Sequence, residues 1–120
     1  MNPTNEMYVT ITGFNHYYDL TPFRVGKLLH CEKEPGNHYD VEAIRCYSPE
    51  IGTLGYVAAS YSCMALGTMS AGRIYDRVPD KFFVRVRFIT QTKVICQVVQ
   101  ATEEDWKREL FIDNPPTAVY

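Results

Sequence analysis

The sequence predicts a single, mainly β domain in which about six short strands form a small curled antiparallel sheet or barrel, with one or two short helices. Three observations lead to this prediction. Most of the chain consists of short segments that alternate apolar and polar residues, with turn-forming residues between them. Only two segments have helical spacing. The length of 120 residues and the apolar content of 46% suit one compact domain over residues 1–120, with its core at about 7–100.

The predicted strands are rich in β-branched and aromatic residues. They are Met7–Phe14, Val25–Lys33, Val41–Tyr47, Thr53–Val57, Phe82–Thr90 and Lys93–Gln100. In the fifth strand, the alternation predicts one apolar face and one face that carries two cations. The apolar face holds Val84, Val86 and Phe88, and the other face holds Phe83, Arg85 and Arg87.

Two helices complete the predicted order. The segment from about Ser60 to Ser70 has apolar residues at helical spacing, and Gly72 is its expected stop. A second short helix follows Thr102, the predicted N-cap, and has acidic residues in its first turn. Residues 113–120 are predicted to form a loose tail. Four strands, a helix, two strands and a final helix favour an OB-like barrel.

The charge balance limits the kind of nucleic-acid contact that the chain can make. The formal net charge is −2 and the pI is about 5.9. A protein that grips a long nucleic acid by its phosphates usually carries a basic surplus. Any nucleic-acid contact of this chain should therefore be short or local.

The cysteines and the N-terminal residues point to a reducing compartment. Cys31, Cys46, Cys63 and Cys96 form no CxxC motif, and three of them stand in apolar runs, which is typical of buried free thiols. Residues 1–6 lack the basic and apolar regions of a signal peptide. No apolar run approaches the length of roughly 20 residues that a membrane span needs. We therefore expect a cytoplasmic protein that does not act at a membrane.

The sequence does not predict catalysis. No Ser/His/Asp or Cys/His set, glycine-rich phosphate loop or metal-ligand cluster stands out. Asp40 and Glu42 are two residues apart and would share a face on a strand, but such a carboxylate pair is too common to indicate hydrolysis. We expect a non-enzymatic protein that needs no metal and no cofactor.

The most informative segment is Lys33–Cys46, KEPGNHYDVEAIRC. Turn-forming residues and two aromatic rings are followed there by a renewed apolar rhythm. Together with TLGYV at Thr53–Val57 and ITGFNHYY at Ile11–Tyr18, this segment resembles the HIRAN domain family, whose core reads Asn-x-Tyr-Asp-x-x-Ala-Ile. The resemblance covers about residues 7–100 in the expected order.

The resemblance implies an OB-like fold and a role in binding DNA. HIRAN domains occur alone in bacteria and phages, or fused to helicase-like proteins that remodel stalled replication forks. The best understood member binds single-stranded DNA at a free 3′-hydroxyl end. The resemblance implies that Asn37, Tyr39 and Asp40 form the binding-pocket motif of the family. Tyr17 and Tyr18 match its aromatic pair, and Tyr56 matches the aromatic residue that follows the glycine of its fourth strand.

Each candidate residue also has a structural interpretation. Asn37 and Asp40 can satisfy backbone amides of their own turn. The tyrosines can pack at the rim or in the core of the barrel. For Arg85 and Arg87, the choice is between an ordinary solvated sheet face and a short stripe that contacts phosphates.

Two functions remain open at this stage. One is a nucleic-acid-binding module that holds a single-stranded DNA end in repair or replication-fork processing. In that role Asp40 would accept a hydrogen bond from a terminal hydroxyl and repel a continuing phosphate. The other is a non-catalytic protein-interaction module that recruits a helicase or nuclease and has no DNA affinity, which the acidic pI permits.

Overall fold

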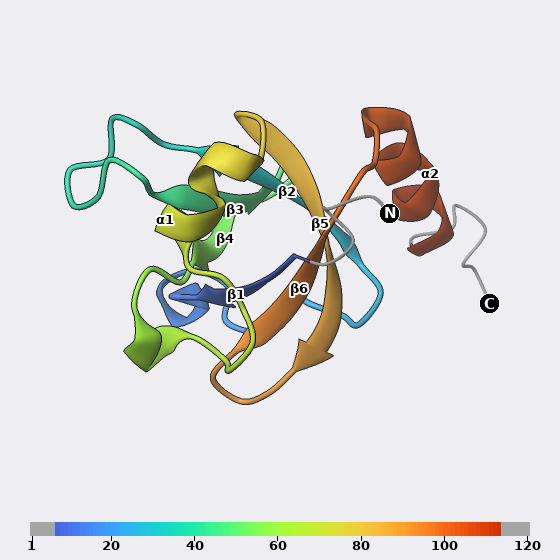
Figure 1. Cartoon of the computed structure of the whole chain (residues 1–120). Helices are drawn as coiled ribbons and strands as arrows, with labels where there is room; N and C mark the ends of the chain where they lie inside the picture. The colour runs from blue at the N-terminus through green and yellow to red at the C-terminus, as the bar shows by residue number, and fades with distance from the viewer. Residues whose placement is uncertain (1–6, 114–120) are drawn as a thin grey trace.

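A computed structural model describes residues 7–113 of the chain. In this range six antiparallel strands close into a barrel with the strand order β1-β4-β3-β2-β5-β6 (Figure 1). The strands are β1 (Tyr8–Thr12), β2 (Leu28–Lys33), β3 (Ile44–Ser48), β4 (Gly52–Val57), β5 (Lys81–Ile89) and β6 (Val94–Val99). The helices are α1 (Ala71–Ile74) and α2 (Glu103–Asp113), with short 3-10 turns at Phe14–His16 (η2), Tyr61–Cys63 (η3) and Tyr75–Arg77 (η4).

This architecture confirms the predicted fold class, a mainly β, OB-like barrel with two short helices. The predictions for the polar N-terminus at 1–6 and for most of the C-terminal tail fall outside the described residues. No helix among residues 7–113 has the length and apolar character that a membrane span requires.

The barrel interior is filled by the apolar side chains that alternate along the strands. The expected burial of the cysteines is confirmed for Cys31, Cys46 and Cys96, which are fully buried, but not for Cys63, which is exposed. A hydrogen bond with Cys46 and burial raise the pKa of the Cys31 thiol, and burial raises the pKa of Cys96. These thiols are therefore held in the protonated form that packs as a small apolar group.

The predicted helix at Ser60–Ser70 is wrong. Beyond the turn η3 this segment runs as an irregular strap, which we define as residues 58–70. The strap is held by β1: the Ala58 amide donates to the Thr10 carbonyl at 2.8 Å, and the Met69 amide donates to the Tyr8 carbonyl at 2.7 Å. Because β4 pairs with β1 only at its far end, β1 offers free backbone groups that compete with helix formation in the strap.

Side-chain hydrogen bonds and a glycine also keep the strap from forming a helix. The Thr10 and Thr68 hydroxyls lie 2.8 Å apart in a buried contact, and the Ala65 amide donates to Thr10 Oγ1. Gly67 adopts a positive φ of 91°, which ends any helical path. Gly72, the expected helix stop, lies inside α1 instead.

Two strands begin three residues later than predicted. β2 starts at Leu28 rather than Val25, because Gly26 takes a positive φ of 91° and forms a turn before the strand. β3 starts at Ile44 rather than Val41, because the backbone before it is folded into a turn around Asp40. The expectation that Asp40 and Glu42 share a strand face is therefore wrong.

A β-bulge in β5 changes which of its side chains face the core, so the predicted faces are wrong at Phe88. Val86 pairs with Cys96 and Phe88 pairs with Ile95, so Arg87 is an extra residue in the ladder. The alternation reverses there, and Phe88 is exposed instead of facing the core with Val84 and Val86.

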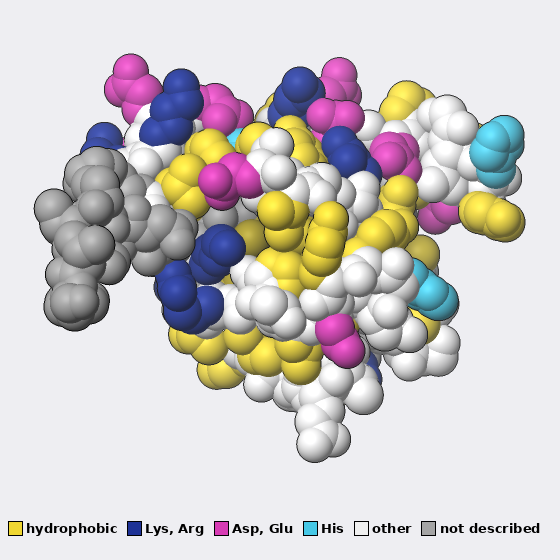
Figure 2. All heavy atoms as spheres, turned by 180° about the vertical axis from the view of Figure 1, so that it is seen from behind, with side chains coloured by type: hydrophobic (Ala, Val, Ile, Leu, Met, Phe, Trp, Pro, Cys, Tyr) yellow, Lys and Arg dark blue, Asp and Glu magenta, His cyan; other side chains and the backbone are white. Residues whose placement is uncertain are grey.

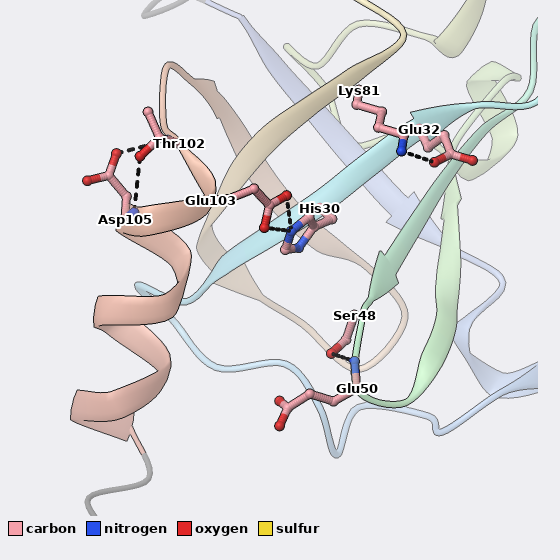
Figure 3. Close-up of polar contacts among 8 residues, drawn as sticks. All are labelled: His30, Glu32, Ser48, Glu50, Lys81, Thr102, Glu103 and Asp105. Carbon is pink, nitrogen blue, oxygen red and sulfur yellow. Dashed lines mark hydrogen bonds and ion pairs between the residues drawn. The ribbon is translucent and has the colours of Figure 1, made fainter.

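The predicted N-cap of α2 is confirmed. The Asp105 amide donates to Thr102 Oγ1 at 3.1 Å, and the Thr102 amide donates to Asp105 Oδ2 at 2.9 Å (Figure 3). The backbone hydrogen bond from Thr102 lowers the pKa of the Asp105 carboxyl. This reciprocal pair is a capping box, which fixes where the helix begins.

Helix α2 docks on the outer face of β2 and β5 around His30. The buried His30 ring lies 4.9 Å from the ring of Trp106 and 4.7 Å from that of Phe83, centroid to centroid. Its Nε2 is 3.0 Å from Glu103 Oε1 (Figure 3). These contacts join the C-terminal helix to the barrel wall.

Candidate functional site

The loop between β2 and β3 is shaped by its own polar side chains. Asn37 Oδ1 accepts hydrogen bonds from the amides of Tyr39, at 2.9 Å, and Asp40, at 3.1 Å. Asp40 Oδ1 in turn accepts from the Glu42 amide at 2.8 Å. The structural interpretation of Asn37 and Asp40 is thus correct, and the loop presents its aromatic tip in one defined conformation.

Glu34 connects this loop to the neighbouring strand. Its Oε1 accepts a hydrogen bond from the Tyr56 hydroxyl at 2.7 Å and another from Asn37 Nδ2 at 3.1 Å. Its Oε2 lies 3.5 Å from Arg45 Nε, an ion-pair contact without hydrogen-bond geometry. Burial and the hydrogen bond to Glu34 raise the pKa of Tyr56. Glu34 therefore fixes both the loop and the ring of Tyr56.

Sequence reasoning missed Glu34 as a site residue. Register explains its position: Glu32 pairs with Arg45 across β2 and β3, and Arg45 pairs with Tyr56 across β3 and β4. Glu34 follows Glu32 by two residues and continues the same outer face. The spacing of Glu32 and Glu34 indicates that the two side chains share a strand face. It does not show that Tyr56 lies on the same face, because that requires the register of β2, β3 and β4.

A pocket of about 350 Å³ lies between the loop and β4, and we call it the tyrosine pocket. It is lined by Tyr17, Asn37, Tyr39, Asp40, Ala43, Tyr56, Val57 and Ala59. The structure therefore brings together five of the six predicted binding residues, from three separate parts of the chain.

Tyr18, the sixth, points elsewhere. Its hydroxyl donates to the Ile51 carbonyl at 2.8 Å, and its ring lines a different pocket of about 350 Å³. The turn η2 ends at Tyr17 with unusual backbone angles, φ −126° and ψ −105°, and Asp19 has a positive φ of 56°. This local geometry separates two rings that are adjacent in sequence.

The tyrosine rings differ in how much of their surface meets solvent. The Tyr39 residue is 98% exposed and Tyr17 is 44% exposed, whereas Tyr56 is half-buried. Tyr39 and Tyr17 therefore present solvent-exposed surface in the pocket that Asp40 also lines, and Tyr56 forms a less exposed part of its wall.

Close spacing of the backbone shapes the wall of the pocket next to Tyr56. An ideal Cβ on Gly55 would lie 2.7 Å from the Thr12 carbonyl oxygen and 3.0 Å from Ile11 Cγ2. Only glycine allows β4 to approach the end of β1 this closely. Gly55 therefore sets the position from which the next residue, Tyr56, projects.

The candidate phosphate contacts Arg85 and Arg87 do not line the tyrosine pocket. Arg85 forms a bidentate pair with Glu109 of α2, at 2.7 and 3.0 Å, and this hydrogen bonding raises the pKa of its guanidinium. Arg87 Nε donates to Gln97 Oε1 at 2.9 Å. Both arginine side chains therefore form hydrogen bonds within the protein.

The charges around the barrel are interspersed. Acidic and basic side chains alternate along one edge of the face seen in Figure 2. Near the tyrosine pocket, Lys33 lies 4.0 Å from Asp80 and over the Tyr75 ring, and Arg45 pairs with Glu34. A second hollow of about 470 Å³ adjoins the tyrosine pocket and includes Lys33 and His38 in its lining. The cations on this side of the pocket, Lys33 and Arg45, are therefore each next to an acidic side chain.

Metal-binding chemistry is not indicated in the part of the chain that the structure describes. No group of three or more His, Cys, Asp or Glu side chains within residues 7–113 is arranged to hold a metal ion. A smaller apolar pocket of about 260 Å³ lies at the start of β5, with Val78, Phe82 and Val98 in its lining. Lys81 is the single ionisable residue in that lining, so the pocket offers little polar chemistry to orient a ligand.

Comparisons with known proteins agree with this geometry. The chain resembles, at 23% identity, the crystal structure of a protein from Lactobacillus plantarum, over 77% of this chain and 88% of that one, with a TM-score of 0.55. It also resembles the HIRAN domain of human HLTF at 15% identity, over 88% of this chain and 83% of that one, with the same TM-score. No curated protein sequence matches it. The family model of the HIRAN domain matches residues 4–98, so the chain belongs to the HIRAN domain family.

Proposed function

We propose that this chain is a nucleic-acid-binding module that holds the 3′-hydroxyl end of single-stranded DNA in the tyrosine pocket. The observation that carries the proposal is the placement of the Asp40 carboxylate among the rings of Tyr17, Tyr39 and Tyr56. Membership of the HIRAN family, which the resemblance links to DNA binding, supports the same assignment.

Asp40 is suited to distinguish an end from the interior of a strand. Its Oδ1 is held by the Glu42 amide, so the carboxylate has a fixed orientation, and Oδ2 has no hydrogen bond from residues 7–113. Oδ2 can accept a hydrogen bond from a terminal hydroxyl. A strand that continued through this point would place a phosphate against the carboxylate, and like charges repel.

The tyrosines supply affinity without basic residues. A base stacked on an aromatic ring contributes roughly 1–3 kcal/mol in comparable single-strand sites. The exposed faces of Tyr39 and Tyr17 can hold one or two bases, while Tyr56 and Glu34 fix the pocket wall. Such a site needs few phosphate contacts, which fits the net charge of −2.

The biological setting follows from the chemistry of the ligand. Free 3′ ends arise in DNA repair and at stalled replication forks, so a module of this kind would act there, alone or beside a helicase or nuclease. In this role the module binds its ligand and is not itself an enzyme, in keeping with the family to which the chain belongs.

A protein-interaction module without DNA affinity is the second candidate. It is favoured by the ion pairs that occupy cations near the pocket, Lys33 with Asp80 and Arg45 with Glu34, and by the almost complete exposure of Tyr39. In that case the protein should recover one stoichiometric partner in a pull-down that nuclease treatment leaves unchanged.

Fluorescence anisotropy with short oligonucleotides separates the two functions. At low salt, an oligonucleotide with a 3′-hydroxyl should bind more tightly than the same sequence with a 3′-phosphate. The Asp40→Asn variant keeps an oxygen for the Glu42 amide but removes the charge, and should reduce this preference by roughly tenfold or more. Asp76→Asn, an exposed acid outside the pocket, is the matched control. Equal or undetectable binding of both ends to the unmodified protein would refute the proposal.

A further inference from the structure

We propose that the tyrosine pocket continues across Ala59 into a second nucleotide subsite, in which Tyr61 stacks the next base and Arg73 contacts the phosphate that joins the two nucleotides. This inference rests on the proposed function, since it extends the path of the same bound strand. It assigns ligand contacts to the strap and to α1, which the motif resemblance does not reach.

The two subsites are continuous. A hollow of about 250 Å³ is lined by Ala59, Tyr61, Met64, Ser70 and Arg73, and it shares Ala59 with the tyrosine pocket. Ala59 is exposed and carries only a methyl group, so no long side chain at this position separates the two hollows. A bound chain can therefore pass over Ala59 from one hollow to the other.

Backbone hydrogen bonds fix the walls of the second subsite. The Ala71 amide donates to the Ala58 carbonyl at 3.0 Å, which joins the start of α1 to the end of β4. Ser70 Oγ accepts from the Arg73 amide at 3.3 Å and caps α1. Tyr61 and Arg73 are thus carried by two segments whose spacing is set by the same short connection.

Helix α1 also adjoins the loop that carries Asp40 (Figure 1). An ideal Cβ on Gly72 would lie 3.2 Å from Glu42 Oε1, so the helix and the loop are in close contact. Arg73 follows Gly72 directly and lines the second hollow. The residues proposed for the first and second nucleotides are therefore neighbours in space, although 33 positions separate Asp40 from Arg73 in the sequence.

Tyr61 has the surface of a stacking platform. It is 89% exposed, and its hydroxyl makes no hydrogen bond with residues 7–113. The half-buried Met64 lies beside it in the same hollow and provides an apolar floor. An exposed ring next to an apolar surface can hold any of the four bases by stacking, because every base has a flat aromatic face.

Arg73 is a free cation at the right place. Several other basic side chains are held by acids: Lys33 by Asp80, Lys81 by Glu32, Arg45 by Glu34 and Arg85 by Glu109. Within the described range 7–113, the exposed Arg73 guanidinium has no ion pair, so it can contact a phosphate without first losing a protein partner. Its position also sets the direction of the strand: with the 3′ nucleotide on Asp40, the linkage on its 5′ side faces Arg73.

The test compares oligonucleotides of one to four nucleotides, each with a free 3′-hydroxyl and no 5′-phosphate, so that the shortest ligand is a nucleoside. Binding by the unmodified protein should strengthen by about tenfold from one nucleotide to two, since one stacked base and one phosphate are added. Arg73→Gln should remove most of this gain and lower the salt dependence, d log K/d log[salt], by about 0.7 for dinucleotides and longer strands. Tyr61→Ala should weaken the same ligands by roughly five- to tenfold, which lies within this gain.

Arg77→Gln is the matched control, because Arg77 is an exposed cation one turn further along that lines neither hollow. A dinucleotide with a neutral methylphosphonate linkage isolates the phosphate contact. It should bind the unmodified protein and the Arg73→Gln variant equally well, since the charge that Arg73 recognises is already absent. Both altered side chains are exposed, and thermal melting verifies that each variant is folded.

The outcomes separate this inference from the proposed function. If Arg73→Gln and Arg77→Gln have equal effects while Asp40→Asn still removes the end preference, the second subsite is refuted and the tyrosine pocket stands. If no oligonucleotide binds the unmodified protein, both proposals fail together.

Discussion

The Tyr56 hydroxyl donates a 2.7 Å hydrogen bond to the Glu34 carboxylate and so connects strand β4 to the loop that follows β2. The same carboxylate accepts from Asn37, whose own side chain positions the amides of Tyr39 and Asp40. One acidic residue thus holds a strand, a loop and the aromatic tip in register. These contacts, and those that dock helix α2 on the barrel, lead to testable predictions.

Replacing Tyr56 with Phe should change how stability depends on pH. Burial and the hydrogen bond to Glu34 raise the Tyr56 pKa above its ordinary value of 10.0. Above pH 10 the unfolded chain loses this proton while the folded chain keeps it, so the stabilising contribution is complete below pH 10 and is lost as the pH rises. Chemical denaturation between pH 10 and 11.5 should show Tyr56→Phe losing stability less steeply than the unmodified protein, by at most about 1.4 kcal/mol per pH unit.

At neutral pH, Tyr56→Phe should lower the free energy of unfolding by roughly 0.5–1.5 kcal/mol, the net value of one hydrogen bond. Glu34→Ala should cost more, because it leaves both Tyr56 and Asn37 without this acceptor and removes an ion-pair partner of Arg45. If the two variants were equally stable, Glu34 would not be the organising residue of the loop.

Tyr17 and Tyr18 should contribute unequally to binding of a single-stranded oligonucleotide. Tyr17 lines the tyrosine pocket, whereas the Tyr18 hydroxyl is bonded to the Ile51 carbonyl in a separate hollow. Tyr17→Ala should weaken binding by roughly 1–3 kcal/mol, the value of one stacked base, and Tyr18→Ala should leave it nearly unchanged. Anisotropy titration measures both, and an equal loss from the two variants would contradict the separation of the rings.

Substitution of Gly55 with Ala should strain the barrel. The added Cβ would lie 2.7 Å from the Thr12 carbonyl oxygen, so β1 or β4 must shift. We expect a loss of about 1–3 kcal/mol in the free energy of unfolding. Gly36→Ala is the matched control: no atom lies within 4 Å of its Cβ position, and its backbone has no positive φ. Denaturant midpoints of the two variants should therefore differ clearly, with Gly36→Ala close to the unmodified protein or slightly above it.

Truncation of Trp106 should loosen α2 from the barrel. The Trp106 ring packs against His30, and the pairs of Glu103 with His30 and Glu109 with Arg85 also join the helix to the barrel. Trp106→Ala should cost about 1–3 kcal/mol, less than a core substitution because the ring is half-buried. Hydrogen exchange should speed up across α2 while β3 and β4 stay protected. Lys107→Ala, at an exposed position of the same helix, should change neither quantity.

The sequence predicted the features that local chemistry controls. The turn-forming residues of Lys33–Cys46 identified the loop and its exposed ring, and Thr102 with its acidic first turn identified the cap of α2. Strand interiors such as Phe82–Val86 were predicted because alternation of apolar residues is itself the consequence of burying one face.

The features that were missed depend on partners distant in sequence. The conformation of the strap could not be predicted from its own sequence. It depends on the backbone carbonyls of Tyr8 and Thr10 in β1, which accept hydrogen bonds from the strap instead of from β4. The bulge at Arg87 has no local signature and appears only when β5 is paired with β6. Glu34 became a site residue through register across three strands, which single-sequence patterns do not contain.

The strap between Ala58 and Ser70 has a consequence for cooperativity. It closes the barrel at the seam where the ladder between β1 and β4 stops, using threonine hydroxyls and two backbone hydrogen bonds. Ala59, the first exposed residue of the strap, is also where the two proposed subsites meet. A ligand lying across Ala59 would bridge both sides of this seam, so its binding free energy would appear as resistance of the barrel to opening. Binding of the DNA strand and closure of the barrel would then be thermodynamically coupled, and each would stabilise the other.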